Sequence, residues 1–100
     1  MPNDAQSLNQ LKKKTKELVS KKIVEFLYER IPYNEIKDLA VFVNESLEKI
    51  NTFEEFLNFL NELKEFYPSL ENEVIILKNK LNENREKQLI ERLQKYVSSF

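Results

Sequence analysis

Apolar side chains recur every three or four residues along almost the whole chain of 100 residues. The spacing holds over residues 8–31, 36–50, 53–67 and 70–100. An α-helix has 3.6 residues per turn, so this spacing places apolar side chains on one helical face. No stretch alternates apolar and polar residues as a half-buried strand does. The sequence therefore predicts an all-α fold.

Prolines and capping residues divide this pattern into four helices. Pro32 and Pro68 end the first and third helices, because proline disfavours helical geometry at the residue before it. Thr52 and Glu55 have the spacing of a capping box. Further helix starts are expected at Asn3 or Asp4, Asn34 and Ser69. The predicted helices cover about residues 5–31, 35–50, 53–67 and 70–98 of a single domain spanning 1–100.

Seven polar residues interrupt the apolar pattern of the last segment between Leu81 and Leu89. The step equals two helical turns of four residues, so one continuous helix keeps the apolar face in phase and puts Arg85 at the missing core position. Arg85 and Gln88 would then lie at a helix seam. A break near residues 82–84 is the alternative, because asparagine is a poor helix former.

The predicted helix lengths favour an antiparallel four-helix bundle-like domain, with long first and last helices and two short middle helices. The short pair would cover only the Ile31–Pro32 end of the long pair. The first half of helix one and the last half of helix four would project beyond the core. A second copy would then bury the apolar residues of this extension. The candidate dimer seam is Leu8, Leu11, Leu89, Leu93 and Tyr96.

Four residue types are absent: glycine, cysteine, histidine and tryptophan. Without glycine there is no P-loop, Rossmann turn or nucleophile elbow. Without cysteine and histidine there is no Cys/His zinc site, thiolate nucleophile, catalytic triad or disulfide. Paired carboxylates remain as raw material for acid–base or metal chemistry, but they are typical of solvated helix faces. We expect no enzymatic activity, metal or cofactor. The pairs are Glu54/Glu55, Glu71/Glu73 and Glu83/Glu86.

Lysines cluster in the first predicted helix, although the whole chain has a net charge of −1. Such a cluster can neutralise phosphates. However, successive lysines point about 100° apart on a helix, and Glu17 and Glu25 lie among them. The middle segment is acidic, which argues against a helix-turn-helix. A solvated face is one interpretation; nucleic-acid binding is the other, with Lys12, Lys13, Lys16 and Lys21 as candidate phosphate contacts.

The three later helices carry more apolar residues than one face of each can hold. Residues 74–77 of the last helix, for example, are four apolar residues in a row. A wide buried arc on central helices is one explanation. The other is an exposed surface for a protein partner, with Val41, Phe59, Phe66 and Ile76 as the candidate interface.

Three segments carry a resemblance to a known family: residues 31–39 (IPYNEIKDL), 53–57 (FEEFL) and 66–73 (FYPSLENE). Over about residues 17–90 the chain resembles a family of small all-helical bacterial domains of unknown function. The resemblance implies a bacterial helical domain and supplies no active site.

The polar N-terminal residues lack the apolar stretch of a secretory signal, and no apolar run approaches the length of a membrane span. We expect a cytoplasmic, non-enzymatic protein–protein interaction or self-assembly domain that forms a homodimer. The alternative is a nucleic-acid accessory factor that binds through the lysine-rich first helix.

Overall fold

A computed structural model describes residues 4–98, with side chains from Gln6 onward. The described residues form four α-helices and one short 3₁₀-helix, with no strand among them. The all-α prediction is confirmed, and the last helix is continuous through residues 82–88. The predicted cap Asn3 lies outside the described residues. The elements are α1 (Asp4–Tyr28), α2 (Tyr33–Lys49), α3 (Phe53–Phe66), η1 (Pro68–Leu70) and α4 (Glu71–Ser98).

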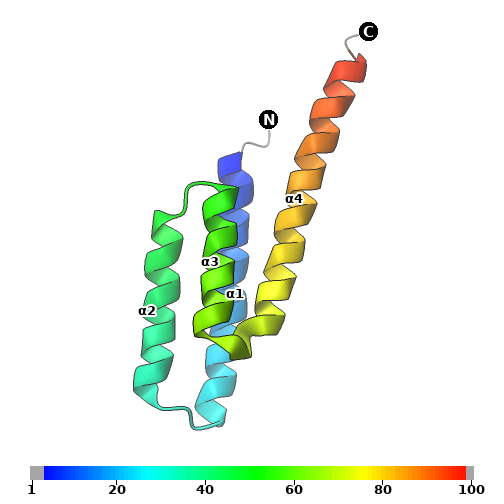
Figure 1. Ribbon diagram of the computed structural model, residues 1–100. Coiled ribbons are helices and arrows are strands. Elements are labelled where there is room, and N and C mark those ends of the chain that lie inside the picture. The colour runs from blue at the N-terminus through cyan, green and yellow to red at the C-terminus, as the bar shows by residue number, and fades with distance from the viewer. Residues whose placement is uncertain (1–3, 99–100) are drawn as a thin grey trace.

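The four helices lie side by side, and the chain reverses direction at each connection (Figure 1). Helix α1 packs against α2 and α4, and α3 packs against the same two helices. The molecule is elongated, with extents of 61 × 22 × 19 Å. The C-terminal end of α4 rises above the other three helices in Figure 1.

The α1–α2 connection is closed by two backbone hydrogen bonds around Arg30, which has a left-handed φ of 61°. The amide of Arg30 donates to the carbonyl of Leu27 at 3.2 Å, and that of Ile31 donates to Phe26 at 3.0 Å. These two bonds define a Schellman motif. Because the motif turns the chain before Pro32, α1 ends at Tyr28, three residues earlier than predicted.

The predicted caps have different outcomes. Thr52 caps α3 as expected, with its Oγ1 accepting from the amide of Glu55 at 3.1 Å. The Glu55 carboxylate reaches back to the Thr52 hydroxyl at 3.1 Å and to the Asn51 amide at 3.3 Å. Asn34 is not a cap, since it lies inside the first turn of α2 after Pro32. Ser69 lies within η1 and does not cap α4.

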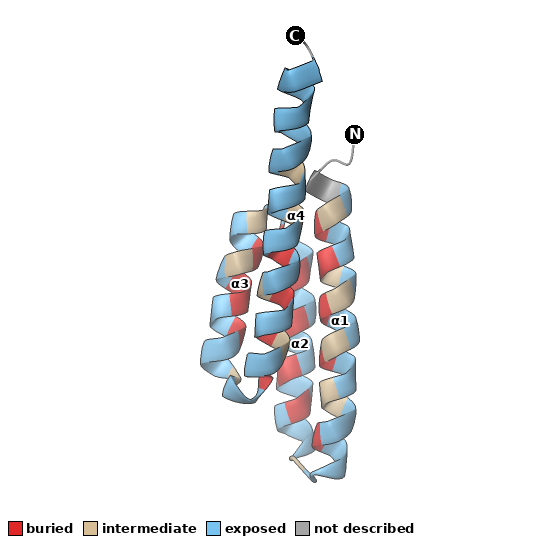
Figure 2. Ribbon diagram, turned by 90° about the vertical axis from the view of Figure 1, so that its right-hand side faces the viewer, coloured by how far each residue is buried: buried red, intermediate tan, exposed pale blue. Residues whose placement is uncertain are grey.

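The core runs along the facing sides of all four helices, as the red bands in Figure 2 show. Its largest fully buried side chain is Phe56 of α3, whose ring centre lies 6.0 Å from that of Phe59. In α4 the buried residues stop at Leu81. The seventeen residues after it on this helix are exposed or half-buried, so most of the second half of α4 contributes nothing to the core.

The predicted two-helix extension is wrong, because α4 alone projects. Leu8 and Leu11 of the predicted dimer seam are buried in the core, at 4% and 2% exposure. The reason is a stagger between the two helix hairpins. The 14-residue α3 ends well above the α1–α2 turn (Figure 1). Helix α4 therefore starts partway up the molecule, and its 28 residues, roughly 42 Å, overshoot the other end.

Candidate binding surfaces

The projecting part of α4 carries a continuous exposed apolar surface, here called the distal face. Its members are between 53% and 70% exposed, although all are large and apolar or aromatic. Three of them, Leu89, Leu93 and Tyr96, belong to the predicted dimer seam. Exposed apolar patches of this kind mark interaction surfaces in soluble proteins. The distal face consists of Leu89, Ile90, Leu93, Tyr96 and Val97.

The distal face points away from the core because of the helical repeat. Leu89 follows Leu81 by eight residues, which is about 800°, or two turns plus about 80°. The prediction that the two stripes stay in phase is therefore wrong. Arg85, predicted for a core position, is exposed, whereas Asn84 and Gln88 are half-buried.

A small polar depression separates the core from the projecting part of α4. It has a volume of about 190 Å³ and lies between the first turns of α1 and residues 84–91 of α4. Gln88 lines it, and its buried Nε2 has no hydrogen-bond partner in the structure. Buried amides of this kind are commonly satisfied by water. Gln88 thus lies at the α1–α4 seam, as predicted, while Arg85 does not.

The four residues of the candidate partner interface do not form one surface. Phe59 is buried, at 4% exposure, so the structure removes it from any exposed surface. Phe66 is 59% exposed and touches Phe42, whose ring also stacks on Phe59. Val41 and Ile76 are exposed on α2 and α4, which lie on opposite sides of the molecule in Figure 1.

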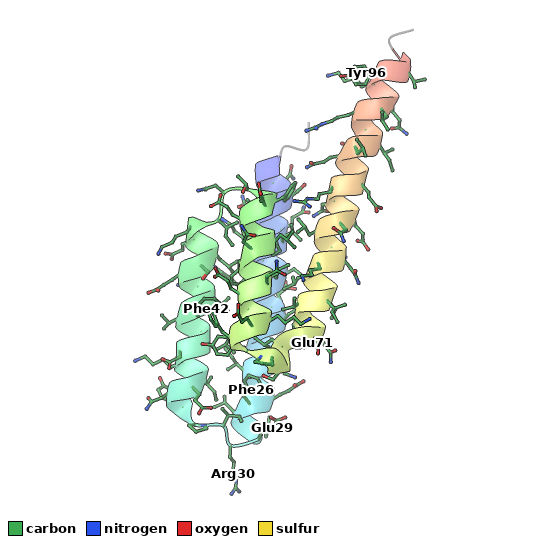
Figure 3. All side chains as sticks on the ribbon, viewed as in Figure 1. Phe26, Glu29, Arg30, Phe42, Glu71 and Tyr96 are labelled. Carbon is green, nitrogen blue, oxygen red and sulfur yellow. The ribbon has the colours of Figure 1, made fainter. Side chains whose placement is uncertain are left out.

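A cleft of about 390 Å³ opens at the end of the molecule opposite to the projecting part of α4. It lies where the α1–α2 hairpin extends below the α3–α4 corner (Figure 3, around Phe26 and Glu29). We call it the acidic cleft, because its charged lining residues are all carboxylates. The lining residues are Phe26, Glu29, Ile31, Glu35, Ile36, Asp38, Leu39, Phe66, Tyr67 and Ser69.

Within the described part of the chain, the three carboxylates Glu29, Glu35 and Asp38 take part in no ion pair. The nearby Arg30 side chain points away from the cleft in Figure 3. Burial raises the pKa of the Tyr67 hydroxyl, and the negative charge of Asp38 raises it further. The cleft therefore combines an apolar floor with three acidic side chains.

The candidate phosphate contacts lie on α1, with Lys13, Lys16 and Lys21 exposed and Lys12 half-buried. Lys22 is engaged within the fold. Its Nζ pairs with Glu25 at 3.2 Å and lies 5.7 Å from the ring centre of Phe26. The hydrogen bond to Glu25 raises the pKa of Lys22. This engagement withdraws one lysine from the basic cluster.

Among the described residues, the carboxylate pairs considered for catalysis or metal binding belong to no larger acidic cluster that could hold a metal ion. Over residues 4–98, no group of three or more acidic side chains is placed to hold a metal ion. Glu71 and Glu83 instead pair with lysines, Lys64 at 3.7 Å and Lys80 at 4.0 Å. No helix in the described range is long and apolar enough to cross a membrane.

Sequence reasoning missed the acidic cleft because its residues come from four separate elements. Phe26, Asp38 and Tyr67 are far apart in the chain and meet only through tertiary packing. A partial signal existed: acidic residues flank Pro32, near which two predicted helices meet. The apolar floor could not be distinguished from ordinary core.

Comparison with protein-family models, curated proteins and solved structures finds no match for this chain. The resemblance to small bacterial helical domains over residues 17–90 stays a prediction.

Proposed function

We propose that this chain is a non-enzymatic self-association module, an antiparallel four-helix bundle that forms a homodimer through the projecting part of α4. The observation that carries this proposal is the distal face. Five large side chains lie on a helix with no intramolecular core to cover them, at 53–70% exposure.

The stability of the projecting segment also supports an assembly role. Isolated helices of this length are marginal in water, and most helical stability in proteins comes from packing of an apolar face. Residues up to Glu91 border the first turns of α1, and the end of α4 that rises above the other helices has no neighbouring helix in Figures 1 and 2. Packing of the distal face against another polypeptide would supply the missing burial, at about 25 cal/mol per Å² of apolar surface.

Sedimentation velocity over a micromolar to millimolar concentration series tests the proposal. We expect the wild-type mass to approach twice the monomer mass at the upper end. Leu93→Glu, which places a charge in the centre of the distal face, should keep the protein monomeric. Ser98→Glu adds the same charge at an exposed position whose neighbours on the helix, Lys95 and Gln94, lie outside the distal face, and it serves as the control. A wild-type protein that stays monomeric throughout the series contradicts the proposal.

A further inference from the structure

The acidic cleft and the projecting part of α4 have complementary chemistry. The cleft contributes three carboxylates and no basic residue. The last two described turns of α4, residues 92–98, contain Arg92 and Lys95 and no acidic residue. Both surfaces also carry exposed aromatic side chains, Phe66 in the cleft and Tyr96 on α4.

The local geometry of α4 places these charges beside its apolar residues. Tyr96 lies four residues from Arg92 and three from Leu93, so its side chain borders both, and Lys95 lies three residues from Arg92 on the other flank. Such a surface can set an aromatic and an aliphatic side chain on the apolar floor of the cleft. The Arg92 guanidinium can then reach the carboxylates at the rim of the cleft, because arginine binds carboxylates through two parallel hydrogen bonds.

One chain cannot make this contact with itself. The cleft and Tyr96 lie at opposite ends of a molecule 61 Å long (Figure 3). In two copies related by a two-fold axis perpendicular to the long axis, each projecting helix would reach the end of the other copy that holds the cleft. Such an isologous pair is closed and makes the contact twice.

We infer that the acidic cleft is the docking site for the projecting part of α4 from a second copy of this chain, with Arg92 and Lys95 facing Glu29 and Asp38. This inference rests on the proposed self-association and specifies which surface the distal face covers. An alternative, in which the distal faces of two copies pack on each other, leaves the cleft outside the interface and is an outcome of the test.

Charge reversal at each surface provides the test, with the dissociation constant measured by sedimentation equilibrium and folding checked by circular dichroism. Glu29→Lys combined with Asp38→Lys reverses the cleft; Arg92→Glu combined with Lys95→Glu reverses the helix. We expect each reversal alone to weaken self-association at least tenfold. Glu45→Lys combined with Glu48→Lys makes the same change in net charge on exposed positions of α2 outside the cleft, and should change the constant less than twofold.

Mixing the two reversed proteins provides the sharpest result. Each helix in the mixed pair then meets a cleft of opposite charge, so association should return to within about threefold of wild type, a difference of less than 1 kcal/mol. A wild-type dimer that tolerates the cleft reversal as well as it tolerates the control reversal overturns the docking site while leaving self-association intact. A monomeric wild type overturns both proposals.

Disulfide trapping gives an independent readout, because the chain has no native cysteine. A protein carrying Asp38→Cys and Lys95→Cys should form covalent dimers under mild oxidation. A protein carrying Glu48→Cys and Lys95→Cys should form them far more slowly. Equal rates for the two proteins would contradict the inferred contact.

Discussion

The amide of Ile31 donates a hydrogen bond to the carbonyl of Phe26 at 3.0 Å, and this bond closes the end of α1 around Arg30. Both residues also line the acidic cleft. The turn therefore fixes one wall of the cleft, and it does so with a non-glycine residue in the left-handed region.

Replacing Arg30 with glycine should stabilise the protein. A left-handed conformation costs a residue with a Cβ about 1–2 kcal/mol, which glycine does not lose. The greater freedom of glycine in the unfolded state cancels about 0.5–1 kcal/mol of that gain. We expect Arg30→Gly to raise the free energy of unfolding by about 0.5–1 kcal/mol, measured by urea denaturation. Arg30→Ala keeps the Cβ and should bring no gain; an equal gain from both variants would contradict the explanation.

Removing the Thr52 hydroxyl should destabilise α3. Thr52 Oγ1 accepts the Glu55 amide at 3.1 Å, and loss of such a cap costs about 1 kcal/mol. Thr52→Ala should lower the free energy of unfolding by about that amount. Asn34→Ala and Ser69→Ala are the controls, since neither residue caps a helix in the structure, and each should stay within about 0.5 kcal/mol of wild type. A larger loss at Asn34 would mean that it caps α2.

The same leucine-to-alanine substitution at two positions of α4 should change the free energy of unfolding much more in the core than on the distal face. Leu81 is 1% exposed and Leu89 is 57% exposed. Leu81→Ala leaves a cavity in the core and should cost about 2–5 kcal/mol of unfolding free energy. Leu89→Ala should cost less than about 0.5 kcal/mol when thermal or urea unfolding is followed at a concentration that keeps the protein monomeric. Similar losses at the two sites would show that Leu89 packs within the monomer.

Stability should fall as the pH rises through and above 10. Burial and the charge of Asp38 raise the pKa of Tyr67 above its ordinary value of 10.0. The hydrogen bond to Glu25, assisted by the charges of Glu73, Glu25 and Glu29, raises the pKa of Lys22 above 10.5. For both side chains, the unfolded state releases the proton at a lower pH than the folded state does. The contribution of each group to the free energy of unfolding is therefore complete below its ordinary pKa. It is lost as the pH rises past the raised pKa of the folded state.

Urea titrations between pH 8 and pH 11.5 would measure this loss. Tyr67→Phe removes one of the two groups whose pKa is raised in the folded protein, and should make the decline shallower above pH 10. Tyr28→Phe is a matched control, because Tyr28 is 85% exposed and lies outside the cleft. A decline that is unchanged by Tyr67→Phe would exclude the buried hydroxyl as a cause.

The helices and most of their boundaries could be predicted from signals between residues that are close in sequence. Apolar residues at helical spacing, Pro32, Pro68 and the Thr52–Glu55 capping box determined four helices, most of whose boundaries fall within two residues of those predicted. These signals act between residues a few positions apart, so they are visible without the fold. The Schellman motif at Arg30 escaped prediction because its usual marker, glycine, is absent from the chain.

Tertiary structure decided which apolar residues are buried. Leu8, Leu11 and Phe59 entered the core, while Leu89 and Leu93 stayed exposed, although all five belong to similar helical stripes. The difference arises from the stagger of the two hairpins and from the 80° by which eight residues exceed two helical turns. The same packing assembled the acidic cleft from Phe26, Asp38 and Tyr67. Helix formation depends on neighbours in sequence, but burial depends on where other helices end, and only the folded chain determines that.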